Sequence, residues 1–313
     1  MESASPAGWN GKSRGGGFGY AFFVLLIRYV GIRAAYAFLA LVVVYFIPCA
    51  PRATAAVWSY CRRRLGYGPL RAAAALFRHY YRFGQTLIDK VAIGGGGGGG
   101  LGFFFGQERG RGGGAAGRYR FLFDNYDDFI ALLESGCGVV VLGAHVGCWQ
   151  AGAHFFGKYG RKINIVMYDA EYERIRRVVE RNTEECGYKV IPINGPTLDT
   201  MLRIKVALNG GEYVCFQGDR YLSPRHTLRH RLLGCEASFP EGPFRLASKL
   251  QVPVVVYYAM RERGRRYRFH FELLARGDER IGSAELLDRY AASLEQILHR
   301  YPEQWFNFYD FWK

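Results

Sequence analysis

The chain has 313 residues, enough for one large domain or two small ones, and Lys and Arg outnumber Asp and Glu by 42 to 27. This positive charge favours an anionic partner such as a phospholipid surface, a nucleic acid or an acidic carrier protein. The seven cysteines are scattered without the paired spacing of zinc ligands, and an odd number fits a disulfide framework poorly. We therefore expect neither a metal site nor an extracellular disulfide scaffold.

The N-terminal part of the chain is the candidate membrane region. Residues 1–17 are polar and glycine-rich, and we expect them to be disordered. Residues 18–51 are almost wholly apolar, and within them residues 34–51 form an uncharged run of 18 residues. That length is at the lower limit for a helix that crosses a bilayer, and Pro48 and Pro51 shorten its helical part. Both a spanning helix and a half-inserted helix fit this sequence.

Residues 52–88 carry seven arginines and no acidic residue, interleaved with seven aromatic residues. This mixture suits a helix that lies on anionic lipid, because the surface attracts cations and aromatic rings prefer the level of the headgroups. The alternative is a basic, solvated face over an ordinary core. We predict that residues 18–93 form a membrane-associated helical region.

A glycine-rich segment follows at residues 94–117, where 14 of 24 residues are glycine and seven of them are consecutive. Glycine loses more conformational freedom on folding than any other residue, so this composition predicts a flexible linker and no regular element.

From residue 119 onward, short apolar runs alternate with amphipathic or charged segments, which indicates an α/β domain over residues 118–313. We expect strands at residues 138–144, 163–168, 190–193, 213–217, 252–261 and 268–274. We expect helices at residues 124–135, 147–159, 171–186, 243–250 and 284–300. Strands this apolar are covered on both faces, so the predicted fold is α/β, a mixed sheet flanked by helices, with membrane-associated helices before it.

The most informative position is His145, which lies just after an apolar strand and before a predicted helix. Strand ends in open α/β sheets are where sites form. A neutral imidazole at this point can take a proton from a hydroxyl if a second group holds its other nitrogen. Gln150 is close enough in sequence to be that group. The alternative for a lone histidine is a structural, hydrogen-bonded side chain.

Three further segments strengthen the functional interpretation of His145. Gly218-Asp219-Arg220 follows a predicted strand and places an acid beside a guanidinium that can hold a phosphate or carboxylate. Phe239-Pro-Glu241-Gly is followed by Arg245 at the start of a predicted helix, where anions are stabilised. Val252-Pro-Val254 then leads the chain into an apolar strand.

The order of these four segments resembles the glycerolipid and lysophospholipid acyltransferase superfamily, whose blocks are H-x-x-x-x-[DE], an arginine block, F-P-E-G and a proline-containing strand. The chain is most similar to the lipid A biosynthesis acyltransferase branch, which also ends in a Pro-x-Gln-Trp segment, here Pro302-Glu-Gln-Trp305. The resemblance covers residues 18–90 and 119–313. It implies the fold of a glycerolipid acyltransferase with N-terminal membrane-associated helices.

Position by position, the resemblance implies that His145 deprotonates the acceptor and that residue 150 supports it. It also implies that Asp219, Arg220 and Glu241 bind the acceptor headgroup or position the two substrates, with Arg245 adding to the anion site. Attack is then direct, without an acyl-enzyme and without a cofactor. We find no G-x-S-x-G nucleophile motif.

One position departs from the family pattern, because residue 150 is Gln where the family has Glu or Asp. A glutamine oxygen can accept the imidazole N–H, but it cannot stabilise the imidazolium by charge. Three explanations stay open: slow catalysis, rescue by another carboxylate, or an active site that has been lost.

The resemblance also implies the partners. The donor is an acyl thioester of acyl carrier protein or of coenzyme A, and the acceptor is a hydroxyl or amine of a membrane lipid of the lipid A type. We expect the chain on an anionic membrane surface, at the cytoplasmic face of the inner membrane. The alternatives are a catalytically impaired lipid-binding homologue and a nucleic-acid binder; the second lacks any recognised module, and we expect no nucleic acid.

Overall fold

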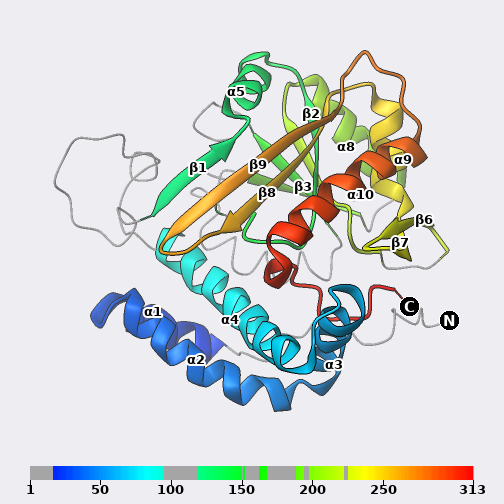
Figure 1. Cartoon of the computed structure of the whole chain (residues 1–313). Coiled ribbons are helices and arrows are strands. Elements are labelled where there is room, and N and C mark those ends of the chain that lie inside the picture. The colour runs from blue at the N-terminus through cyan, green and yellow to red at the C-terminus, as the bar shows by residue number, and fades with distance from the viewer. Residues whose placement is uncertain are drawn as a thin grey trace.

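The computed structural model describes residues 17–94, 119–149, 151, 162–167, 188–193, 197–221 and 225–312. Within these residues, a layer of N-terminal helices lies beneath an α/β domain (Figure 1). Residues 1–16 of the predicted disordered N-terminus, the glycine-rich linker apart from Gly94, the helix at residues 171–186 and most of the helix at residues 147–159 lie outside the described residues. The proposed division of the chain into four regions stays a prediction.

A seven-stranded sheet forms the centre of the α/β domain, in the order β1-β9-β8-β2-β5-β3-β4. Neighbouring strands are parallel except for β8 and β9, which are antiparallel. The strands are β1 (Arg120–Asp124), β2 (Val139–Gly143), β3 (Ile163–Met167), β4 (Tyr188–Pro192), β5 (Tyr213–Gln217), β8 (Val254–Arg261) and β9 (Arg266–Ala275). The prediction of a mixed sheet is confirmed.

The central strands are apolar because both of their faces are covered. All eight residues of β8 are buried, as are the first four of β2. Phe129 of α5 (Tyr126–Glu134) packs against Phe271 of β9, with ring centres 4.7 Å apart. Tyr301, just after α10 (Ser283–Arg300), contacts His270 instead. Adjacent residues of a strand point to opposite faces, so α5 and the end of α10 lie on different faces of the sheet.

The described part of the domain also contains two further helices and a hairpin. They are α8 (Thr197–Asn209), α9 (Glu241–Leu250) and the antiparallel pair β6 (Thr227–Leu232) and β7 (Cys235–Pro240). Every predicted strand, and each predicted helix that the structure describes in full, is confirmed to within two residues at its ends. Among the described strands and α-helices of this domain, β1, α8 and the β6–β7 hairpin were not predicted.

The N-terminal layer consists of α1 (Gly17–Tyr29), α2 (Ile32–Cys49), α3 (Pro51–Ser59), a π-helical turn (Tyr60–Arg64) and α4 (Pro69–Gly94). Among the described helices, α2 alone is long and apolar enough to cross a membrane, with 18 residues and a mean hydropathy of 2.0. Only 22% of this helix is buried within the protein. Leu41, Val44 and Tyr45 are among its exposed apolar side chains. The structure thus presents one N-terminal apolar helix with a largely uncovered surface.

Helix α4 connects this apolar helix to the rest of the protein. A Cβ atom added at Gly84 of α4 would lie 2.4 Å from the Leu39 side chain of α2, so glycine permits the close approach of the two helices. Other residues of the helical layer are built into the core. Tyr80 is 7% exposed and contacts Phe308, with ring centres 5.3 Å apart. Tyr60, in the π-helical turn, is 6% exposed and stacks on Trp312.

These contacts correct one expectation from the sequence. Tyr60 and Tyr80 were expected at the level of the lipid headgroups, and the structure buries both against the C-terminal aromatic segment. The reason is that aromatic partners from residues far along the chain offer these rings a dry contact surface, which the local pattern of arginines and aromatic residues does not reveal.

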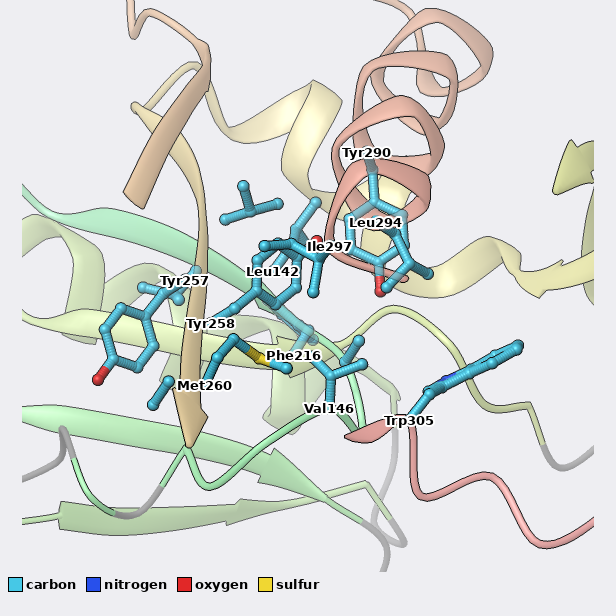
Figure 2. Packing of buried hydrophobic residues seen from close by; sticks show 14 of the residues in the cluster. Leu142, Val146, Phe216, Tyr257, Tyr258, Met260, Tyr290, Leu294, Ile297 and Trp305 are labelled. Atoms are coloured by element: carbon cyan, nitrogen blue, oxygen red, sulfur yellow. The ribbon is translucent and has the colours of Figure 1, made fainter. Parts of the chain in front are cut away.

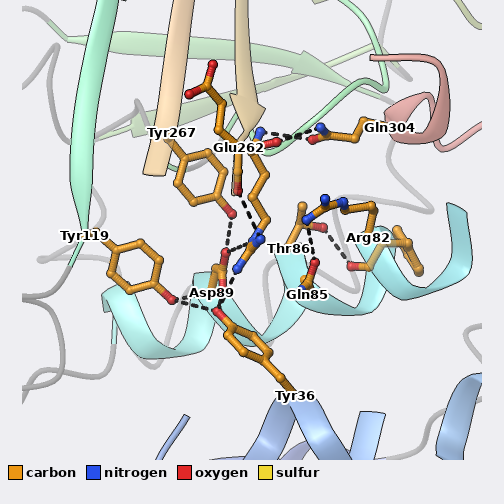
Figure 3. A network of polar contacts seen from close by, with 11 residues as sticks. Tyr36, Arg82, Gln85, Thr86, Asp89, Tyr119, Glu262, Tyr267 and Gln304 are labelled. Carbon is orange, nitrogen blue, oxygen red and sulfur yellow. Dashed lines mark hydrogen bonds and ion pairs between the residues drawn. The ribbon is translucent and has the colours of Figure 1, made fainter. Parts of the chain in front are cut away.

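A buried ion pair joins the helical layer to the sheet (Figure 3). Arg261, the last residue of β8, donates from Nε to Asp89 of α4 at 2.8 Å, and the two side chains are 3% and 0% exposed. Tyr119 and Tyr267 also donate to the Asp89 carboxylate, at 2.9 and 2.6 Å, and so does Tyr36 of α2. A buried charge needs this complete set of partners, because an unpaired one is strongly destabilising.

Arg261→Met is therefore expected to lower the free energy of unfolding by roughly 3–5 kcal/mol, because it leaves the Asp89 carboxylate buried without its cation. The measurement is denaturant unfolding in detergent. Adding Asp89→Asn to this variant should recover part of the loss, and no recovery would contradict the explanation. Arg203→Met serves as the control, because its pair with Asp199 is exposed and should contribute at most about 0.5 kcal/mol.

His79 predicts a pH dependence of stability. Its ring lies between Phe306 and Phe308 at 1% exposure, and burial lowers its pKa from 6.5 to about 3. In the unfolded chain the ring gains a proton below about pH 6.5, whereas in the folded chain it stays neutral down to about 3. Acid therefore favours the unfolded chain throughout this window, so stability falls as the pH is lowered through it.

His79→Phe is expected to reduce the decrease in melting temperature between about pH 7 and about pH 5, since this side chain then binds no proton on unfolding. Leu70→Phe, at an exposed site of the same helix, changes no titratable group and provides the control, which should leave the slope unchanged. Part of the slope should persist in both variants, because burial also lowers the pKa of His270 to about 4. An identical slope in wild type and His79→Phe would refute the assignment.

Candidate active site

The candidate site forms where two adjacent parallel strands end. Gly143, the last residue of β2, pairs with Gln217, the last residue of β5. The chain leaves both strands at the same edge of the sheet, which places His145 and Asp219 two residues beyond the paired ends. The His145 ring nitrogen Nδ1 lies 2.7 Å from Asp219 Oδ1, although 74 residues separate them in sequence.

Asp219 accepts hydrogen bonds from three groups. Besides the His145 ring, the backbone N–H of His145 donates to Oδ2 at 2.8 Å, and the indole Nε1–H of Trp305 donates to Oδ2 at 3.0 Å. A carboxylate can only accept, so the proton in the ring contact resides on Nδ1 of His145. The lone pair of Nε2 is then free to accept a proton, and within the described residues Nε2 forms no hydrogen bond.

The two partners differ in exposure and charge. The Asp219 side chain is fully buried, whereas the His145 side chain is 25% exposed. Burial alone raises the pKa of the Asp219 carboxyl, but the charge and hydrogen bond of the adjacent His145 outweigh it, helped by Arg220, and bring the pKa to about 2. Asp219 is therefore ionised at neutral pH, so it can hold the ring and also stabilise the imidazolium that forms on protonation.

A C-terminal segment fixes the loop that carries His145. Phe306 N–H donates to the His145 carbonyl at 2.8 Å, Gly147 N–H donates to the Gln304 carbonyl at 2.9 Å, and Val146 and Trp305 form an antiparallel bridge. Figure 2 shows Val146 and Trp305 close to the buried residues beneath α10. Together these backbone bonds leave the loop little freedom to move the imidazole.

Gly147 is required in this loop for two reasons. Its φ angle of +58° lies in the left-handed region that side chains disfavour. A Cβ atom there would also lie 2.1 Å from the carbonyl oxygen of Ala259 in β8. The neighbouring Cys148 N–H donates to that same carbonyl at 2.8 Å, so the loop presses directly against the central strand.

The other predicted site residues lie in two places. Arg220 follows Asp219 and donates from Nη2 to the Phe306 carbonyl at 2.9 Å, with its guanidinium 6.0 Å from the Tyr309 ring centre. Glu241 is the first residue of α9, and Arg245 donates to it at 3.2 Å across one helical turn. No contact among the described residues joins Glu241 or Arg245 to His145.

The structure also brings in residues that the sequence did not single out as functional. Trp305 holds the carboxylate of Asp219, and Gln304 bonds both to the His145 loop and to the backbone of Arg261, at 2.9 and 2.7 Å. The Pro-x-Gln-Trp segment was the signal that could have identified them. Gln150 lies outside the described residues.

Fold and site together define a class of protein: an α/β protein with a carboxylate-supported histidine at the carboxyl ends of parallel strands, beside an apolar helix. The chain belongs to the bacterial lipid A biosynthesis acyltransferase family, whose model matches residues 118–313, more than half of the chain. The resemblance to this family is thereby confirmed, and with it an acyltransferase activity. Proteins of this family are membrane-associated and act in lipid metabolism. A search of curated proteins finds no significant match.

Trp305→Phe is expected to lower the rate of acyl transfer roughly tenfold or more, because a hydrogen bond to a charged acceptor contributes about 1.5–3 kcal/mol. The effect should appear in kcat and leave KM nearly unchanged, since Trp305 is buried and donates its indole N–H to Asp219. Trp312→Phe is the matched control: its indole donates to the Leu232 carbonyl and not to the site. Equal rates in both variants would count against the role of Trp305.

Proposed function

We propose that this chain transfers a fatty acyl group from a thioester of acyl carrier protein or coenzyme A to a hydroxyl or amine of a membrane glycolipid of the lipid A type. His145 acts as the general base and Asp219 as the carboxylate that orients it. The observation that carries the proposal is the 2.7 Å contact between His145 Nδ1 and the buried Asp219, which leaves Nε2 available on a partly exposed ring.

The chemistry follows from the position of the proton on the ring. Nε2 removes the proton from the acceptor O–H or N–H as the acceptor atom attacks the thioester carbonyl carbon. The new bond forms, the C–S bond of the tetrahedral intermediate breaks, and the departing sulfur takes the proton back from Nε2. The imidazolium exists only between these two transfers, and the ionised Asp219 stabilises it throughout.

Asp219 is also a candidate for the supporting carboxylate that the family has at position 150 and that this chain replaces with Gln. Of the three explanations left open by the sequence, rescue by another carboxylate has a specific geometric basis, because an ionised acid already contacts Nδ1. In this proposal Asp219 orients the base and does not bind the headgroup, since its side chain is fully buried. Arg220, Glu241 and Arg245 are proposed to hold the acceptor headgroup.

Membrane association gives the enzyme access to a lipid acceptor. Exposed apolar side chains on α1 and α2 include Leu25, Tyr29 and Leu41, and surfaces of this kind are normally covered by lipid or by a partner. We place the protein at the cytoplasmic face of the inner membrane, where soluble acyl thioesters are available. The net positive charge suits both an anionic lipid surface and an acidic carrier protein.

Three substitutions test the roles of the site residues. His145→Ala is expected to reduce acyl transfer by roughly 10²–10⁴-fold, as for loss of a general base. Asp219→Asn should have a comparably large effect, by analogy with the roughly 10⁴-fold loss when a triad Asp becomes Asn. Gln150→Glu should change the rate little, because Asp219 already supports the ring. His299→Ala, at an exposed site, is the control.

The substrates can be identified by mass spectrometry of cellular lipids. Three cultures are compared: cells that express the wild-type chain, cells that express the His145→Ala variant, and cells that express neither. A lipid heavier by one acyl chain should appear with the wild type alone, and its mass identifies both the chain and the acceptor. The same lipid profile in all three cultures would favour the alternative of a catalytically silent lipid-binding homologue.

A further inference from the structure

A strongly basic pocket lies between α4, the β8–β9 turn and the end of α10. Its volume is about 530 Å³, and seven arginines but only two glutamates line it. Arg71, Arg78 and Arg82 come from α4, whereas Arg263 and Arg266 flank the turn between the two strands. Positive charges from separate elements therefore converge on one concave space.

Several of these charges are already neutralised. Arg78 pairs with Glu303 and Arg261 with Asp89, and Arg300 lies 3.4 Å from Asp124. Glu262, the other acid of the pocket, is paired with Arg268 at 2.8 Å.

The other four arginines, Arg71, Arg82, Arg263 and Arg266, form no ion pair with any carboxylate in the described parts of the chain. Arg82 is partly buried and donates to the neutral oxygen of Gln85 at 3.0 Å. Burial lowers the pKa of Arg82, and the nearby charge of Arg261 lowers it further, against a smaller opposing effect of Glu303. An anion in the pocket would relieve this repulsion.

The chemistry of the pocket fits a phosphate group with more than one negative charge. A phosphomonoester carries a charge of about −1.5 to −2 at neutral pH, whereas a phosphodiester carries about −1. Guanidinium groups bind phosphate oxygens in pairs through a planar fork, and four uncompensated ones exceed what a single negative charge would balance.

The location of the pocket favours a lipid as the molecule that carries the phosphate. Helix α4 contributes arginines to the pocket and packs against the apolar helix α2 through Gly84 and Leu39. Packed helices lie about 8–10 Å apart, so the pocket is roughly one helix layer from α2. The headgroup region of a bilayer occupies a similar depth outside its hydrocarbon core, about 5–8 Å on each side. A carrier protein, by contrast, would dock on an open surface and not within a concave pocket.

We propose that this pocket binds the phosphomonoester headgroup of a membrane lipid. The site is separate from the His145–Asp219 pair, and its assignment does not depend on the proposed reaction. It shares one wall with the catalytic loop, because Gln304 lines the pocket and also accepts the Gly147 N–H bond.

The test measures binding of the full chain to two kinds of vesicle without any acyl donor, so that the result is independent of catalysis. One kind contains phosphatidic acid, a phosphomonoester, and the other contains phosphatidylglycerol, a phosphodiester, at a mole fraction that equalises surface charge. We expect the wild type to bind phosphatidic acid vesicles roughly tenfold more tightly, as one additional charge-assisted contact provides.

Arg82→Gln/Arg263→Gln should abolish this preference. Arg52→Gln/Arg63→Gln is the matched control, because it removes two exposed charges from the same helical layer outside the pocket. The control should weaken binding to both vesicles equally and keep the preference. Arg82→Lys/Arg263→Lys retains charge but not the guanidinium fork; a reduced preference is expected there, and it gives a result even if the Gln variant does not fold.

Three results would overturn the proposal. The first is equal binding of both vesicles by the wild type, and the second is equal loss of preference in the pocket variant and in the control. The third is a pocket variant that keeps the lipid preference but loses binding to an acidic carrier protein. Soluble glycerol phosphate distinguishes a lipid phosphate from a free, soluble phosphomonoester. If it binds as tightly as the phosphatidic acid vesicle, the assignment to a lipid fails.

Discussion

The carboxylate of Asp219 is the contact on which the site depends, because three segments distant in sequence meet at its two oxygen atoms. It receives the ring and backbone of the β2 loop through His145 and the indole of the C-terminal segment through Trp305. Burial makes each of these bonds stronger than it would be in water and makes the loss of any one more costly. A fully buried anion of this kind persists only because every donor is in place.

The same constraint reaches the N-terminal helices. Gln304 precedes Trp305 and holds both backbone groups of Arg261, whose side chain holds Asp89 of α4. The apolar layer and the His145 loop are therefore fixed to one another through a short series of buried polar contacts. An enzyme that takes its acceptor from a bilayer needs such a fixed relation, because a base displaced by about 1 Å loses much of its effect.

The sequence allowed the prediction of β2, β5 and β8, because strands covered on both faces must be continuously apolar, and of His145 at a strand end. The β6–β7 hairpin was missed because β6 is mostly polar, although Cys235, Ala237 and Phe239 of β7 alternate with polar residues. Asp219 was recognised as a site residue, but its contact with His145 was not, since that contact depends on the pairing of β2 with β5. Gln150 was assigned a supporting role because it is near His145 in sequence; it lies outside the described residues, so that assignment stays a prediction.

The segment around Trp305 is synthesised after all the elements that it contacts. Every strand of the sheet precedes it in the chain, so a nascent polypeptide can assemble the sheet and insert its apolar helix before the indole has left the ribosome. Until then the carboxylate lacks one donor and the histidine loop lacks its backbone clamp. In the order of synthesis, the contacts around Asp219 are therefore completed after the apolar helix and every strand of the described sheet.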